Sequence, residues 1–141
     1  MQYRKVKDGY LIRLDRGEEI VNSLTGIVRR EQIPGGIISG IGAVEKATLG
    51  IYDIHAASYI TKSFGDRLEI GNLTGNIAYD EESGEPVVHC HITVADNSLR
   101  SFSGHLFEAV VLVTAEIFIL TIDEKIFRRK DIKSGFKLLR L

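Results

Sequence analysis

Apolar residues recur at helical spacing in one early segment of the chain. The spacing predicts a helix from about residue 18 to residue 31, because apolar positions three and four apart share one side of a helix. The stretch "IPGG" at 33–36 ends it, since proline and glycine stop helices. The preceding "GYLIRL" at 9–14 is typical of a strand. The apolar face of the predicted helix consists of Ile20, Leu24, Ile27 and Val28.

Most of the remaining chain has the patterns and turn residues of strands. The segment "GIISGIGAVEKATLGIYD" at 36–53 suggests two strands with a glycine-rich kink at Gly40 and Gly42. Further strands are predicted in "RLEIGNLTGNIAYD", "VVHCHITVA", "LRSFSGHLFE", "KIFRRKDI" and "GFKLLRL". With 141 residues and no repeat or interdomain linker, the chain is expected to form one domain, residues 1–141.

The most apolar run, Val110 to Ile122, has apolar residues on both alternating sets of positions. A strand of this kind needs cover on both faces of its sheet. The predicted helix can cover one face of a small sheet, so something else must cover the other. In a chain this short, a second copy of the same chain is the simplest cover, and the sequence therefore predicts an oligomer.

Three of the four histidines lie in one region, "VVHCHITVADNSLRSFSGHLFE" at 87–108. Side chains alternate faces along a strand, so His89 and His91 point one way and Cys90 points the other. Residues two apart on one strand face are close enough for their imidazoles to converge on one ion. A third ligand has to come from a neighbouring strand.

The position of His105 depends on the length of the turn before it. A two-residue turn would pair it with Cys90, on the wrong face, whereas an odd turn such as 97–99 would pair it with His91. A bulge near Gly104 would have the same effect as the odd turn. We expect the odd register, because it also gathers three apolar residues on the opposite face: Ile92, Val94 and Phe102.

Three neutral imidazoles without a thiolate favour zinc, with copper, nickel or iron as alternatives. Three protein ligands leave a fourth position for water, whose pKa bound zinc lowers to about 7, so hydrolytic or hydration chemistry is permitted. The alternative is that three surface histidines merely lie near one another. The fourth histidine, His55, lies in an expected loop and is not expected to be a ligand.

Charge is unevenly distributed along the chain. The net charge of −1 does not suit a chain built as a whole to bind nucleic acid. Residues 123–141, however, hold seven basic and three acidic residues. They form either a solvated strand face and tail or a phosphate-binding, nucleic-acid patch, for which the candidates are Arg128, Arg129, Lys130 and Lys133.

Two other features bear on location and partners. The single cysteine excludes an intramolecular disulfide, and no segment has the apolar length of a signal peptide or membrane span, so a cytoplasmic protein without a membrane partner is expected. Arg67 and Glu69 share a strand face and are candidates for a surface ion pair, a ligand contact or an interface contact.

Three segments, "SGIGAVEKATLGIYD", "RLEIGNLTGNIA" and "HCHITVADNSLRSFSGHLFEAVVLVTAEIFI", together resemble the plant and prokaryote conserved (PPC) domain over about residues 9–122. The resemblance implies an α/β (α+β) fold, in which a mostly antiparallel sheet packs with one main helix, and a homotrimer. The stretch "RLEI" at 67–70 is similar to the arginine-phenylalanine-glutamate-isoleucine signature that plant members use in partner contacts, with Leu68 replacing the aromatic residue. The positions of His89, His91 and His105 resemble the histidine pattern of stand-alone prokaryotic members of the family.

Three functions remain as alternatives. The first is a metal-containing, homotrimeric binding or assembly module. The second is a DNA-binding protein, acting directly or through partners, although the chain lacks the Arg-Gly-Arg-Pro AT-hook with which plant members of the PPC family contact DNA. The third is a zinc-dependent hydrolase or lyase, for which Glu69 and Glu108 are the candidate general acids or bases.

Overall fold

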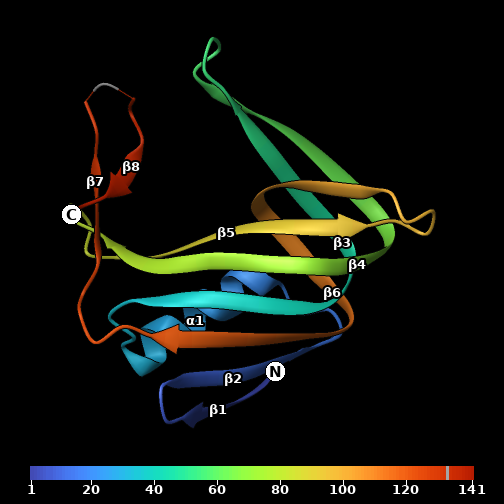
Figure 1. Ribbon diagram of the computed structural model, residues 1–141, viewed down its shortest axis with the longest axis horizontal. Helices are drawn as coiled ribbons and strands as arrows, with labels where there is room; N and C mark the ends of the chain where they lie inside the picture. Colours follow the sequence, from blue (N-terminus) through green and yellow to red (C-terminus); the bar gives the residue numbers. More distant parts are fainter. Residues whose placement is uncertain (133) are drawn as a thin grey trace.

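The computed structural model describes residues 1–132 and 134–141, in which a mostly antiparallel sheet packs with a single helix (Figure 1). This confirms the α+β fold class. In chain order the elements are β1 (Gln2–Val6), β2 (Gly9–Asp15), α1 (Ile20–Glu31), β3 (Gly36–Asp53), β4 (Ser58–Asp80), β5 (Pro86–Ala95), β6 (Ser101–Thr121), β7 (Phe127–Lys130) and β8 (Lys137–Leu139).

The helix α1 forms where the apolar spacing predicts it. Glu19 caps its first turn, because its carboxylate accepts hydrogen bonds from the backbone N–H groups of Val21 at 3.1 Å and Asn22 at 2.7 Å. Gln32 ends it in the left-handed conformation, with φ 52°. In the described part of the chain, no helix is long and apolar enough to cross a membrane. The predicted apolar face is fully buried: Ile20, Leu24, Ile27 and Val28.

Four strands close into a ring, because β3 pairs with β4 and β6, and β5 also pairs with β4 and β6. Long strands must bend to close such a ring, and β3 shifts register between Gly40 and Gly42 and again between Val44 and Lys46. The predicted kink at the glycines is therefore confirmed. The expected division into two strands is wrong, since a bulge bends the ladder without ending it.

The sequence patterns missed two strand segments. One is β1, whose mostly exposed residues pair with β2 at the edge of the sheet, where charged side chains discourage pairing with other chains. The other is residues 58–66 of β4, which pair with the end of β3 in a hairpin that extends away from α1 (Figure 1). Both segments are weakly apolar, so their pairing is decided by the partner strand.

The face of the sheet opposite α1 carries several solvent-exposed apolar side chains. Along β6, buried Ile117 and Ile119 alternate with Phe118 and Leu120, which are 55% and 52% exposed. On β3, Ile37 lies directly opposite Leu120 and is half exposed. We call this set the open-face apolar patch, and its members are Ile37, Ile41, Phe118 and Leu120.

The close approach of β4 to β5 at Gly75 is expected to matter for stability. A Cβ atom there would lie 2.3 Å from the carbonyl oxygen of His89 and 2.7 Å from Sγ of Cys90. Because the strands would have to separate, Gly75→Ala should lower the free energy of unfolding by about 1–3 kcal/mol in urea denaturation. On the same strand, Gly71→Ala is the matched control, since its Cβ would meet nothing closer than Thr93 O at 3.9 Å. Equal losses in the two variants would contradict the prediction.

Candidate metal centre

Three histidines from two neighbouring strands face one another on the ring of strands. His89 and His91 lie on β5 and His105 lies on β6, and one ligand nitrogen from each lies within 4.8 Å of the other two. The ring centroids are 5.4 Å apart for His89 and His91, 4.9 Å for His89 and His105, and 5.6 Å for His91 and His105. The structure thus brings together the three residues that the sequence singled out.

The pairing of β5 with β6 has the predicted register, because His91 lies directly opposite His105. The loop between the paired strands contains residues 96–100, an odd number, although it is longer than the three-residue turn suggested above. Asp96 closes this loop by accepting hydrogen bonds from the backbone N–H and the guanidinium of Arg100. The loop therefore sets the parity that puts all three histidines on one face.

Cys90 lies on the opposite face of β5, as alternation predicts. Its side chain is only 1% exposed, in the core. Burial, together with the negative charge of Glu19, raises the pKa of the thiol to about 12. The thiol is therefore protonated at neutral pH and belongs to the core.

A fourth polar side chain reaches the histidines from the C-terminal hairpin of β7 and β8. Nη2 of Arg128 lies 2.9 Å from Nδ1 of His89 and 2.7 Å from Oδ1 of Asn76. A guanidinium only donates hydrogen bonds, so Nδ1 of His89 accepts, and a neutral imidazole then carries its proton on Nε2. In the sequence, Arg128 stands out only as a member of a basic cluster, and nothing in the local sequence links it to the histidines.

Two of the histidines, His89 and His105, are held in the neutral form. Burial, followed by the charge of Arg128, lowers the pKa of His89 from 6.5 to about 4. Burial also lowers the pKa of His105, and the charges of His91 and Arg128 add to the effect. At pH 7 these two rings are unprotonated at one nitrogen, which is the form that binds a metal.

The donor set fits a transition metal. Nitrogen atoms about 2.0–2.1 Å from a tetrahedral zinc ion lie ~3.3 Å apart, so small rotations of the three rings would bring them into place. Nδ1 of His105 is buried and has no hydrogen-bond partner among the described residues. A buried polar atom in this state calls for a partner, and a metal ion between the rings is one that the neighbouring imidazoles can share.

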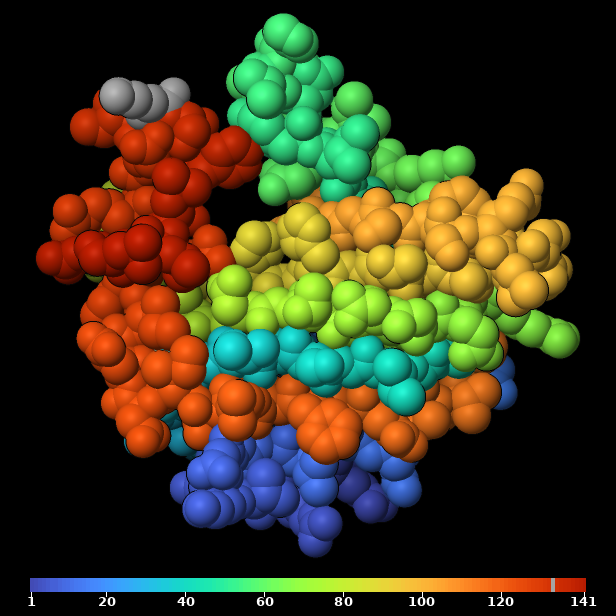
Figure 2. All heavy atoms as spheres, viewed as in Figure 1, coloured from blue at the N-terminus to red at the C-terminus, as the bar shows by residue number. Residues whose placement is uncertain are grey.

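Aromatic side chains flank the cluster on the side of His105. The ring of Phe107 lies 4.8 Å from that of His105, and the ring of Tyr59 lies 5.3 Å from it. Phe136, just before β8, contacts Tyr52 on the β3–β4 hairpin with centroids 4.2 Å apart. The surface is hollowed above β5, between this hairpin and the C-terminal hairpin (Figure 2).

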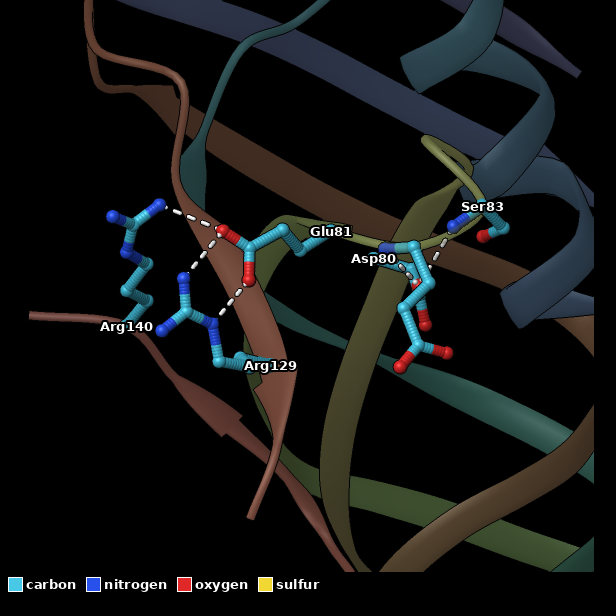
Figure 3. A network of polar contacts seen from close by, with 6 residues as sticks. Asp80, Glu81, Ser83, Arg129 and Arg140 are labelled. Carbon is cyan, nitrogen blue, oxygen red and sulfur yellow. Dashed lines mark hydrogen bonds and ion pairs between the residues drawn. The ribbon is translucent and has the colours of Figure 1, made fainter.

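Ion pairs hold the C-terminal hairpin against the end of β4. Glu81, just after β4, accepts hydrogen bonds from both Arg129 and Arg140 (Figure 3). Lys137 forms an ion pair with Asp80, and this contact lowers the pKa of Asp80 to about 2. These contacts fix the position of β7, the strand that carries the guanidinium to the histidines.

The candidate basic residues do not lie together on one exposed surface. Arg128 is 8% exposed and faces His89, whereas Arg129 is paired with Glu81. Lys130 is exposed at the end of β7. Lys133 lies outside the described residues.

The other candidate residues lie outside the histidine cluster. Arg67 and Glu69 are exposed on the same face of β4, as predicted, and neither has an ion pair within residues 1–132 and 134–141. Glu108 pairs with Lys46 at 2.8 Å. His55 lies in the turn after β3.

A family model, the Plants and Prokaryotes Conserved (PCC) domain, matches residues 1–123. It is the same family as the PPC domain that the sequence resembles. This chain belongs to the PCC domain family. The match ends before β7, so the guanidinium of Arg128 reaches the histidines from beyond the matched part of the PCC domain. The contact between Arg128 and His89 therefore joins the part of the chain that the family model matches to the C-terminal hairpin of β7 and β8.

Solved structures similar to this PCC protein include one from Ralstonia eutropha JMP134, provisionally named a DNA-binding protein. It has 32% sequence identity and a TM-score of 0.92, and the similarity covers 99% of this chain and 95% of that one. A metal-containing protein from Archaeoglobus fulgidus has 30% identity and a TM-score of 0.85, covering 97% of this chain and 96% of that one.

A curated relative is the bifunctional protein GlmU of Synechococcus sp. (strain JA-3-3Ab). It is 29% identical over 94% of this chain. The chain spans 20% of the length of this relative. The similarity therefore concerns a part of GlmU of about the size of one PCC domain.

We expect the metal-free protein to lose stability as the pH falls from about 6.5 to about 4. Folded His89 takes up a proton only near pH 4, whereas the unfolded chain takes one up near pH 6.5, so protons favour unfolding across this window and the full stabilisation is present above it. Thermal unfolding followed by circular dichroism at a series of pH values measures the loss. His89→Gln keeps a hydrogen-bond acceptor but has no group that titrates between pH 4 and pH 6.5, so this variant should lose less stability over that range. Identical pH dependence in the two proteins would refute this assignment.

Proposed function

We propose that this protein binds one zinc ion, or another divalent transition metal, per chain through His89, His91 and His105. The observation that supports the proposal is the convergence of three imidazoles, one of which has a buried nitrogen without a partner in the described structure. The metal-containing relative from Archaeoglobus fulgidus adds to this support. When bound, such a metal supplies a Lewis-acidic position open to water or to a ligand.

The residues of the chain would prepare this site in different ways. Strand register places His91 opposite His105, and burial keeps His89 unprotonated at neutral pH. Arg128 lies beside His89 and contacts Asn76, so these two side chains border one of the proposed metal-binding histidines.

We further propose that the metal site belongs to a homotrimeric binding or assembly module. The support is the open-face apolar patch, whose members are half exposed although they lie on a sheet. Contiguous apolar side chains on a protein surface mark an interface, and another copy of the same chain can cover them. The similarity to the PPC domain noted from the sequence favours three copies.

DNA binding, directly or through partners, is the second candidate function. It is favoured by the provisional name of the Ralstonia relative. The C-terminal basic residues give it little support, since Arg129 is engaged by Glu81 and Arg128 is buried.

A zinc-dependent hydrolase or lyase is the third candidate. It requires a general acid or base beside the metal. The cluster found among the described residues consists of histidines, and Glu108 is engaged by Lys46. The binding module is therefore the function that the site supports best.

Elemental analysis of the purified protein, after zinc is offered and excess zinc is removed, is expected to find about one zinc per chain. His91→Ala should lose it, because two histidines remain and His91 is an exposed residue whose removal leaves the core intact. His55→Ala removes a histidine outside the cluster and is the matched control, expected to keep its zinc. Wild-type protein without zinc, or zinc retained in His91→Ala, would reject the site.

The oligomer can be tested by light scattering during size-exclusion chromatography. We expect a mass of three chains of 15.7 kDa each. Phe118→Lys should dissociate the assembly, because it would bury an unpaired charge in the interface. Ile54→Lys is the matched control, since Ile54 is 82% exposed in the turn after β3. A monomeric wild-type protein, or equal masses in both variants, would contradict the trimer.

A further inference from the structure

The side chain of Arg128 is a buried cation without a carboxylate partner. It is 8% exposed, and its hydrogen bonds go to the carbonyl oxygen of Lys137, to Oδ1 of Asn76 and to Nδ1 of His89. Its Nε atom is buried and has no partner among the residues that the structure describes. No carboxylate of the described chain forms an ion pair with it.

Buried charges are normally paired, because removing an ion from water costs several kcal/mol unless an opposite charge compensates. The two acidic residues at and after the end of β4 that contact this hairpin are already engaged. Glu81 holds Arg129 and Arg140, and Asp80 holds Lys137 (Figure 3 shows Glu81 between its two arginines). The environment of Arg128 is therefore short of one negative charge.

Metal binding at the histidines would increase this shortage. If Nε2 of His89 is a ligand, its proton moves to Nδ1, and two donors then face each other across the contact with Arg128. If Nδ1 is the ligand, the guanidinium loses its acceptor directly. In both cases two N–H groups of Arg128, the one that contacts His89 and the one on Nε, lack a hydrogen-bond acceptor.

Space for an acceptor exists beside these groups. A pocket of about 230 Å³ is lined by Thr74, Gly75, Asn76, His89 and His91, next to the Asn76 amide that contacts Arg128. The hollow between the C-terminal hairpin and the β3–β4 hairpin opens above the same strand, β5 (Figure 2). A molecule of a few heavy atoms can enter at this place.

We propose that Arg128 and the metal held by the three histidines together bind a small oxyanion, with the chemistry of a carboxylate or a phosphate. This inference rests on the proposed metal site. Neutral imidazoles leave the full double charge of the metal uncompensated, and Arg128 adds a third positive charge beside it. A guanidinium fork matches a pair of oxygen atoms, so one oxygen can face the metal while others accept from Arg128.

Cobalt-substituted protein tests the inference, because the visible absorption of bound cobalt changes when an anion enters its coordination sphere. Acetate and inorganic phosphate are titrated separately into wild type, Arg128→Gln, Arg128→Lys and Lys130→Gln, with metal per chain measured in each sample. Lys130→Gln is the matched control, since it removes a positive charge from an exposed residue of the same strand, β7. Circular dichroism reports whether each variant is folded.

Wild type and Lys130→Gln should bind at least one of the two anions saturably and with similar affinity. Arg128→Gln should keep its cobalt but bind that anion about 30-fold or more weakly, as expected for loss of a hydrogen-bonded charge partner. Arg128→Lys keeps the positive charge but lacks the paired N–H groups of the guanidinium, so its anion affinity should lie between those of wild type and Arg128→Gln. This variant preserves the test if Arg128→Gln does not fold. Tighter binding of acetate identifies a carboxylate site, and tighter binding of phosphate identifies a phosphate site.

Two failures are distinguishable. Wild-type protein that binds no metal would overturn the proposed metal site and this inference with it. Bound cobalt whose spectrum responds to neither anion, or responds equally in wild type and in both Arg128 variants, would overturn the anion site alone.

Discussion

The register between β5 and β6 is the constraint on which the histidine cluster depends. Side chains alternate along a strand with a period of two, so a slip of one residue would turn His105 away from His91 and toward the core. The same slip would bring core residues to the surface. Burial of the core face of β5 and β6 therefore also fixes how the histidines are placed on the opposite face. The five-residue loop at 96–100, closed by Asp96, has the parity that both faces require.

Electrostatics in the cluster follow from this placement. His89 and His105 are partly buried and feel the charge of Arg128, and both conditions disfavour protonation of their rings. Neutral rings suit a cation, but the guanidinium does not, because it brings a second positive charge to the same place. A bound anion would reconcile the two, which is why Arg128 is better understood as part of a ligand site than as part of a nucleic-acid surface.

The C-terminal hairpin of β7 and β8 adds a contact to the histidines from outside the region that the family model matches. The ion pairs that dock β7 and β8 are mostly at the surface, where each contributes little to stability. Their effect is positional, because they place one strand so that its inward-facing residue reaches β5. The open-face apolar patch lies on the same outer face of the sheet as the histidines, since the register pairs Leu120 with Ile37, Ile37 with Asn76, and Asn76 with His89. The proposed assembly surface therefore adjoins the proposed metal site.

Local patterns in the sequence determined the helix, most of the strands and the set of histidines. Ile20 to Val28 follow the helical period, and His89, His91 and His105 follow the strand period once the loop parity is known, so short-range geometry was sufficient for both. The kink at Gly40 and Gly42 was visible for the same reason. The patterns could not show β1 or the start of β4, because weakly apolar segments become strands only when a partner edge is available to them. Nor could they place Arg128 beside Asn76, 52 residues away along the chain, because that contact depends on how the last hairpin docks on the finished sheet. The sequence by itself therefore determined the local elements and which histidines share a face, whereas only the tertiary structure decided which distant charge stands beside them.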